Sequence, residues 1–270
     1  MNKRIVVILG MGRSGTSFLA NWLHKCGVDM GENLKPADDI MNTEGFYEDV
    51  DFLLLIEYFR YRCVSAWDKF AVNEVKWTDN SEIVEKFERL VLARNNKKVW
   101  GLKILSLTFL WKQLWFPIFT KNKIHKEVLV IGAFRDFHKC IDSNMRASLL
   151  TKISPFKRIH FLLFKNRFAN RYLKEWISCN LQIIDFIENN KQNNNWLLLD
   201  TKYLLESSEK IFTHLVNDNG LKIKYIDPNS IFHYAIMDRK SNIKYKLDSV
   251  LLTQANEILK KLITLRENQF

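Results

Sequence analysis

The sequence lacks a cysteine framework. Its four cysteines, Cys26, Cys63, Cys140 and Cys179, lie far apart and form neither a CxxC pair nor a spacing typical of zinc ligands. Disulfide scaffolds and structural zinc sites depend on such spacings. We therefore expect no disulfide framework and no structural metal, and we expect a reducing compartment.

Long apolar runs are also missing. The run Ile5–Leu9 stops at Gly10, which makes it too short for the core of a signal peptide. The most apolar later stretch, 104–119, is interrupted by Lys112 and Gln113, and no uncharged run approaches the ~20 residues of a membrane span. The sequence therefore predicts a soluble, cytoplasmic protein and leaves a contact with a membrane surface open.

Acidic residues are absent from one basic part of the chain. The formal net charge is +11, and no Asp or Glu occurs from Arg146 to Lys174. Basic and aromatic residues are interleaved there, namely Lys152, Lys157, Arg158, Lys165, Arg167 and Arg171 with Phe156, Phe161, Phe164, Phe168 and Tyr172. We interpret the segment around 146–174 as a helical insertion. It is either a solvated face over core aromatics or a flap that contacts an acceptor or a membrane.

The apolar pattern predicts an α/β fold in one domain, residues 1–270, because a chain of this length with 47% hydrophobic residues can bury a sizeable core. Four buried strands are indicated at Ile5–Leu9, Val99–Leu102, Val128–Ile131 and Trp196–Leu199. Amphipathic stretches indicate helices at about Thr16–Cys26, Asp49–Arg62, Ser81–Asn95, Phe137–Leu149 and Arg167–Asn190, and a closing helix around 247–266. Their alternation predicts a three-layer α/β/α P-loop-type domain with a central, mainly parallel sheet.

The strongest functional signal is a glycine-rich turn between the first strand and the first helix. Such a turn points backbone N–H groups into one concavity at the positive end of a helix, where phosphate binds. Gly10 and Gly15 have the spacing of the GxxxxGK[ST] loop of triphosphatases, but Thr16 stands where that loop has its lysine. The cation is Arg13 instead. We expect a phosphate-bearing ligand to bind at Gly12, Arg13, Ser14, Gly15, Thr16 and Ser17.

A second anion site is predicted after the third strand. Arg135 follows this strand at the carboxyl edge of the sheet, where open α/β sheets bind ligands. Ser143 comes eight residues later, about two turns into the next helix, and can approach the same anion.

These motifs resemble those of sulfotransferases that use 3′-phosphoadenosine 5′-phosphosulfate (PAPS). The family's 5′-phosphosulfate loop commonly reads [RK]-[ST]-G-T-[ST], as residues 13–17 do, and the segment Asn42–Asp49 looks like its bacterial branch. The family's 3′-phosphate motif, Arg-Asp-Pro followed by Ser, matches Arg135 and Ser143, with Phe137 in place of proline. The resemblance implies transfer of a sulfuryl group from PAPS to a hydroxyl or amine, with no metal.

Sulfuryl transfer needs cations near the breaking bond, an in-line acceptor and a base. Arg13 is the first candidate for the cationic role. Lys103, at the end of the second strand, is the second; it resembles a family lysine, although Ile104-Leu105-Ser106 departs from the acid, proline and arginine often found there.

The base is predicted among the carboxylates of segment 42–49, because neighbouring aromatics can desolvate a carboxylate and raise its pKa. We favour Glu48 over Glu44. We expect Asp49 to be the N-cap of the next helix, and His138 is the alternative base in a histidine-type enzyme.

Two other functions stay open. A small-molecule kinase would need carboxylates for magnesium, and Asp200 is the one strand-end acid that suggests this. A non-enzymatic binder of nucleic acid or of an anionic surface would use the basic segment, although we expect no nucleic-acid partner. The acceptor can be a glycan, a lipid or a small alcohol or phenol, and Arg239-Lys240-Ser241 can fold back over the nucleotide.

Overall fold

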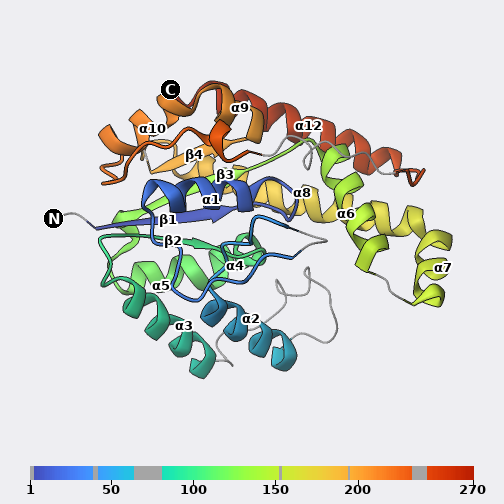
Figure 1. Cartoon of the computed structure of the whole chain (residues 1–270). Coiled ribbons are helices and arrows are strands. Elements are labelled where there is room, and N and C mark those ends of the chain that lie inside the picture. Colours follow the sequence, from blue (N-terminus) through green and yellow to red (C-terminus); the bar gives the residue numbers. More distant parts are fainter. Residues whose placement is uncertain (1–2, 39–41, 64–80, 152–153, 194, 233–241) are drawn as a thin grey trace.

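Four parallel strands form the centre of the protein. The computed structural model describes residues 3–38, 42–63, 81–151, 154–193, 195–232 and 242–270, with the main chain alone at 60–63. The strands are β1 (Arg4–Leu9), β2 (Val99–Lys103), β3 (Val128–Ala133) and β4 (Trp196–Leu199). They lie in the order β2-β1-β3-β4, and each neighbouring pair is parallel (Figure 1). The four predicted strands and the parallel sheet are confirmed.

The register of the sheet gathers the functional segments at one edge. β1 pairs with β2 on one side and with β3 on the other, so that Ile8 lies opposite Lys103 and Leu9 lies next to Gly132. The carboxyl ends of these three strands therefore meet. The turn that follows β1, the last residue of β2 and Arg135 after β3 come from distant parts of the sequence but reach the same edge.

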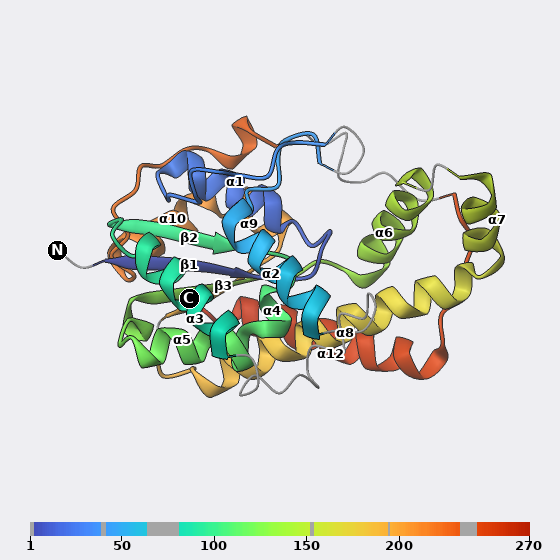
Figure 2. The same ribbon diagram turned by 90° about the horizontal axis from the view of Figure 1, so that it is seen from below.

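Helices cover both faces of the sheet, which confirms the predicted three-layer arrangement (Figures 1 and 2). Side chains alternate between the two faces of a strand. Val6 and Ile8 of β1 face one layer, made of α1 (Thr16–Cys26), α9 (Thr201–Glu206) and α10 (Ser208–Asn217). Ile5, Val7 and Leu9 face the other layer, whose helices include α2 (Val50–Cys63), α3 (Ser81–Arg94), α6 (Phe137–Thr151), α8 (Lys165–Asn189) and α12 (Ser249–Glu267).

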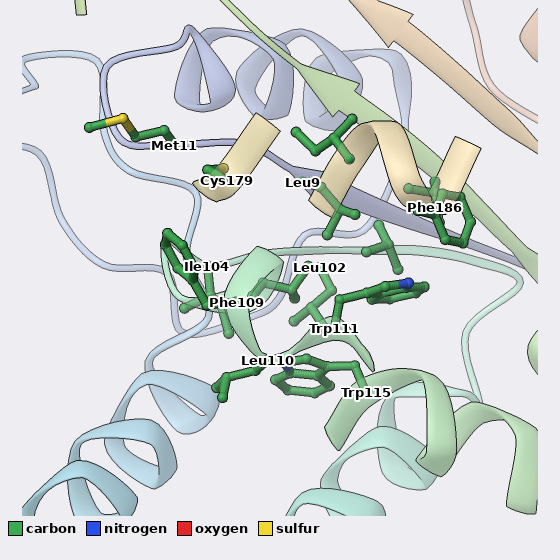
Figure 3. Packing of buried hydrophobic residues seen from close by; sticks show 14 of the residues in the cluster. Leu9, Met11, Leu102, Ile104, Phe109, Leu110, Trp111, Trp115, Cys179 and Phe186 are labelled. Carbon is green, nitrogen blue, oxygen red and sulfur yellow. The ribbon is translucent and has the colours of Figure 1, made fainter. Parts of the chain in front are cut away.

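The apolar stretch after β2 forms a tryptophan-rich wedge. It consists of α4 (Leu107–Leu110), the π-helix η3 (Trp111–Trp115) and α5 (Phe116–Lys121). The ring of Trp115 meets those of Phe52 and Phe87 edge to face, with centroids 5.5 and 5.2 Å away. Trp111 meets Phe186 of α8 in the same way at 5.6 Å. In Figure 3, Trp111 and Trp115 lie below Leu9 and Leu102 of the sheet, and Phe186 lies beside them.

The described residues of the basic segment around 146–174 are largely helical. It comprises the end of α6, α7 (Pro155–Leu163) and the start of α8. The short elements α4, η3, α5, α9 and α10 were not predicted, nor were the 3₁₀ turns η4 (His125–Glu127) and η5 (Pro228–Ser230). Arg239-Lys240-Ser241 lies outside the described residues. Within the described ranges, no helix is both long and apolar enough to cross a membrane.

Candidate active site

The turn between β1 and α1 has an unusual backbone. Gly15 has φ of 88° and Arg13 has φ of 74°, both in the left-handed region. A Cβ added at Gly15 would lie 2.5 Å from the hydroxyl of Thr201, so both conformation and space require glycine there. Arg13 adopts the same left-handed conformation, which is energetically unfavourable for a residue with a Cβ. Proteins keep such residues mainly at functional sites.

The N-terminus of α1 is open to a ligand. Gly15 occupies the N-cap, and within the described part of the chain no side chain caps the helix. The first N–H groups of α1 therefore remain available to an anion, which the helix dipole also favours. Ser14 is buried with its Oγ atom 3.6 Å from Sγ of Cys140, and it shapes the turn from inside.

A pocket of about 110 Å³ opens beside this turn, and most of the predicted site residues line it. Arg13, Gly15, Thr16 and Ser17 come from the turn and α1, Glu44 from the segment before α2, and Arg135 and Ser143 from the β3–α6 region. The structure therefore brings both predicted anion sites to one pocket. Gly12 lies against Leu105 and is not part of the lining.

Arg13 and Ser143 are in direct contact. Nε of Arg13 donates a hydrogen bond of 2.8 Å to Oγ of Ser143, and Nη1 of Arg135 reaches the carbonyl oxygen of Arg13 at 3.4 Å. Burial, followed by the positive charges of Arg146 and Arg135, lowers the pKa of Arg13 below its usual value. Positive groups that repel one another in this way are stabilised when an anion binds among them.

Arg146 was not predicted to be a site residue. It follows Ser143 by three positions on α6, which places both on one side of the helix. This i,i+3 spacing is the signal that could have identified it.

Lys103 and Glu48 form a buried ion pair next to the pocket. Nζ of Lys103 lies 2.8 Å from Oε1 of Glu48, and 2% of each side chain is exposed. Nζ also donates to Oγ of Ser17 and to the carbonyl oxygen of Phe46, both at 3.1 Å. Burial lowers the pKa of Lys103, and the charge of Glu48 opposes that shift. Lys103 is thus not a surface lysine, and it reaches the pocket through the hydroxyl of Ser17.

The other candidate bases have different surroundings. Glu44 is exposed and lines the pocket. Asp49 accepts a hydrogen bond of 3.0 Å from the N–H of Asp51 and pairs with Arg94 at 2.6 Å, which confirms it as the N-cap of α2. Burial raises its pKa. His138 is exposed in the first turn of α6 and does not line the pocket.

Two features of the pocket were not predicted. Phe18 and Phe232 meet edge to face with ring centroids 4.8 Å apart and form an aromatic wall. Asn21 lines the pocket with 2% of its surface exposed, and no donor among the described residues reaches its Oδ1 atom. Buried polar atoms are nearly always paired, so this oxygen points to a ligand. Asn21 follows Ser17 by four residues, and that spacing was the available signal.

A second pocket of about 440 Å³ lies beyond Arg135 and Phe232, which line both pockets. Asp200 is one of its lining residues. Its carboxylate caps α9 by accepting a hydrogen bond of 3.0 Å from the N–H of Tyr203, and it forms an ion pair with Arg266. In the described ranges, no cluster of three or more His, Cys, Asp or Glu side chains can hold a metal ion.

The parallel sheet and the turn after its first strand define a P-loop-type α/β fold. No family model matches the sequence, and no curated protein matches it. The sulfotransferase domain from the Synechococcus PCC 7002 olefin synthase is a structural match with a TM-score of 0.50 and 12% identity, over 97% of this chain and 95% of that one. The sulfotransferase domain from the curacin biosynthetic pathway matches with a TM-score of 0.48 and 14% sequence identity, over 97% of this chain and 98% of that one. The first match shows that this chain has a sulfotransferase-type fold, as the resemblance implied.

Proposed function

We propose that the protein is a sulfotransferase that moves a sulfuryl group from PAPS onto an acceptor hydroxyl or amine. The observation that carries the proposal is the meeting of two anion-binding segments in one pocket, where Arg13 donates a 2.8 Å hydrogen bond to Ser143. PAPS carries anionic groups at both the 5′ and 3′ positions of its ribose. A site for it needs two such segments side by side.

Each end of the donor has matching partners. The 5′-phosphosulfate binds at Arg13, Thr16, Ser17 and the first N–H groups of α1. The 3′-phosphate binds at Arg135 and Ser143, with Arg146 adding positive charge. Planar guanidinium groups suit both anions because they donate two parallel hydrogen bonds.

The base of the nucleotide has an aromatic wall to pack against. Phe18 and Phe232 supply it. The pocket of about 110 Å³ is smaller than a typical ligand site of roughly 300–1,000 Å³. Phe232 stands between it and the second pocket of about 440 Å³. We therefore expect this ring to move when the nucleotide binds.

Transfer is an in-line displacement. The acceptor oxygen or nitrogen bonds to sulfur while the bond from sulfur to the bridging phosphate oxygen breaks, and adenosine 3′,5′-bisphosphate leaves. Arg13 stabilises the negative charge that develops on the leaving group. Lys103 donates a hydrogen bond to Ser17 and so holds the Ser17 hydroxyl beside the leaving group. The acceptor proton passes to a carboxylate. Geometry favours Glu44, which lines the pocket, while Glu48 fixes Lys103 and stays the alternative base.

No observation favours the rival functions. A kinase would need a cation at position 16 and a carboxylate free to hold magnesium, yet Asp200 is engaged by Arg266 and by the N-terminus of α9. Anion binding alone does not require a buried lysine–glutamate ion pair next to the pocket, such as the pair of Lys103 and Glu48.

The test is thermal unfolding with adenosine 3′,5′-bisphosphate and, separately, with ATP and magnesium. Ligand at ~100-fold its Kd adds roughly 2.7 kcal/mol of stability. We expect the bisphosphate to raise the Tm of the unsubstituted protein and of Arg89→Ala, whose side chain is exposed on α3. Arg135→Ala should lose most of the shift. A magnesium-dependent ATP shift without a bisphosphate shift would overturn the proposal.

A further inference from the structure

Helix α7 exposes apolar side chains on the face that points away from the protein. Phe156, Ile159 and Leu163 are 78%, 58% and 75% exposed. Their i, i+3, i+7 spacing places them on one side of the helix, whereas Phe161 on the opposite side is fully buried. In Figure 2, α7 lies at the end of the molecule farthest from the N-terminus and projects beyond the sheet and its helices.

Basic side chains border this apolar face. Lys157 and Arg158 are exposed, and at 100° per residue they lie on either side of the face, each about 100° around the helix from the nearest residue of the face. Arg167 and Lys174 on the neighbouring α8 are exposed as well. The first carboxylate after Arg146, that of Glu175, is buried and pairs with Arg171 at 3.4 Å. From Arg146 to Lys174 the charged side chains are therefore all basic, and the carboxylate of Asp248, whose N–H bonds to Asn170 of α8, caps the N-terminus of α12.

This combination selects one kind of partner. An apolar helix face bordered by Lys and Arg binds in the interface of a lipid bilayer, where apolar side chains enter the acyl region and basic ones meet anionic headgroups. A second copy of the chain is a poorer match because α7 against α7 would bring Lys157 and Arg158 close to their like-charged counterparts. The described helices offer no membrane span as an alternative anchor.

We propose that α7 docks the protein on the surface of membranes that contain anionic lipids. Phe156, Ile159 and Leu163 insert, while Lys157 and Arg158 contact lipid phosphates. α6 carries Ser143 of the pocket and ends at Thr151, about 12 Å further along the helix axis and shortly before α7 in the sequence. The proposal does not depend on the proposed function.

The test is flotation with lipid vesicles. The vesicles contain phosphatidylcholine alone or with one third phosphatidylglycerol. The variant Phe156→Ser/Ile159→Ser/Leu163→Ser is compared with a matched control, Leu54→Ser/Leu92→Ser/Leu181→Ser, which replaces three exposed leucines on other helices. All six side chains are exposed, so both variants should unfold at nearly the temperature of the unsubstituted protein.

We expect the unsubstituted protein and the control to float with the anionic vesicles, and the α7 variant to bind them at least tenfold more weakly. The variant Lys157→Gln/Arg158→Gln should also lose affinity, by about fivefold for each charge removed, and high salt should weaken binding. Equal binding by the α7 variant and the unsubstituted protein would overturn the proposal. So would a dimer in light scattering that the α7 substitutions dissociate, together with no flotation.

Discussion

Arg13 and Ser143, 130 positions apart in the sequence, are joined by a hydrogen bond of 2.8 Å from Nε to Oγ. One residue belongs to the turn after β1 and the other to the second turn of α6. The bond fixes the guanidinium of Arg13, which has a left-handed backbone, before any ligand arrives. Arg13 therefore connects the two anion sites through a direct hydrogen bond as well as through its charge.

Replacing Ser143 by alanine should weaken the binding of adenosine 3′,5′-bisphosphate by about tenfold. The variant removes a hydroxyl from the pocket and leaves Nε of Arg13 without its acceptor, and hydrogen bonds to charged groups contribute roughly 1.5–3 kcal/mol. Isothermal titration calorimetry measures the effect. Asn144→Ala on the same helix is the control, because Asn144 bonds to the carbonyl of Cys140 and does not line the pocket. Equal loss in both variants would contradict a specific role for Ser143.

Asn21→Leu should weaken ligand binding without destabilising the fold. The Oδ1 atom of Asn21 is buried with no donor among the described residues, so an apolar side chain of similar size removes no protein hydrogen bond to that atom. We expect the free energy of unfolding, measured in urea, to change by less than about 1 kcal/mol, while the affinity for the bisphosphate or for the acceptor falls severalfold.

Asn21→Asp should weaken anion binding further because it adds a negative charge to the pocket. If Asn21→Leu unfolds far more easily and binds ligand normally, the oxygen has a structural role instead.

Lys103 and Glu48 should behave as one unit. Removing either charge leaves the other buried and unpaired, at a cost of about 3–5 kcal/mol. Lys103→Met and Glu48→Leu should each be strongly destabilised in urea, whereas the double variant should lose much less than the sum. Additive losses would mean that the two charges do not depend on each other. We expect the double variant to fold and to be inactive in sulfuryl transfer.

Cys140 should make stability fall at alkaline pH. Burial raises the pKa of its thiol to about 11, above the value of an unfolded cysteine. Between pH 9 and about 11 the unfolded chain releases this proton while the folded one keeps it, so the free energy of unfolding decreases as the pH rises.

Urea unfolding across this range should have a shallower pH slope in Cys140→Ala than in the unsubstituted protein, with a difference of roughly 2–3 kcal/mol by pH 11. Identical slopes would show that the thiol ionises as readily in the folded protein as in the unfolded chain.

The strands were predictable because each is an apolar run with a polar boundary. Ile5–Leu9 and Trp196–Leu199 are examples, and the long amphipathic helices such as α8 have a clear period. The wedge at 107–121 was not predicted. Its buried residues Trp111, Leu114, Trp115, Ile118 and Phe119 do have helical spacing, but apolar Phe116 and Pro117 on the exposed side obscure the pattern, and the chain is divided there into three short elements. α9 is a short helix of 6 residues with little pattern of its own, whereas the buried Ile211 and Leu215 of α10 have a helical spacing that was available in the sequence.

The site was predictable where its residues lie at or just after strand ends, as Arg13, Lys103 and Arg135 do. The order of the strands brings these positions together. The sequence could not reveal that Lys103 bonds to Glu48, because that contact depends on how the segment 42–49 folds back over β2. Phe232 comes from yet another part of the chain, and no local signal marks it.

The central place of β1 also governs the order in which the protein can assemble. Its partners β2 and β3 are synthesised only after α3 and η4, respectively. All residues that pair with β1 in the sheet are therefore distant from it in sequence. Folds with such non-local pairing form slowly, because loop closure precedes the gain from the contacts. During synthesis, Ile5–Leu9 therefore emerges as an apolar strand with both edges open, a segment that chaperones would have to shield until β3 has been made.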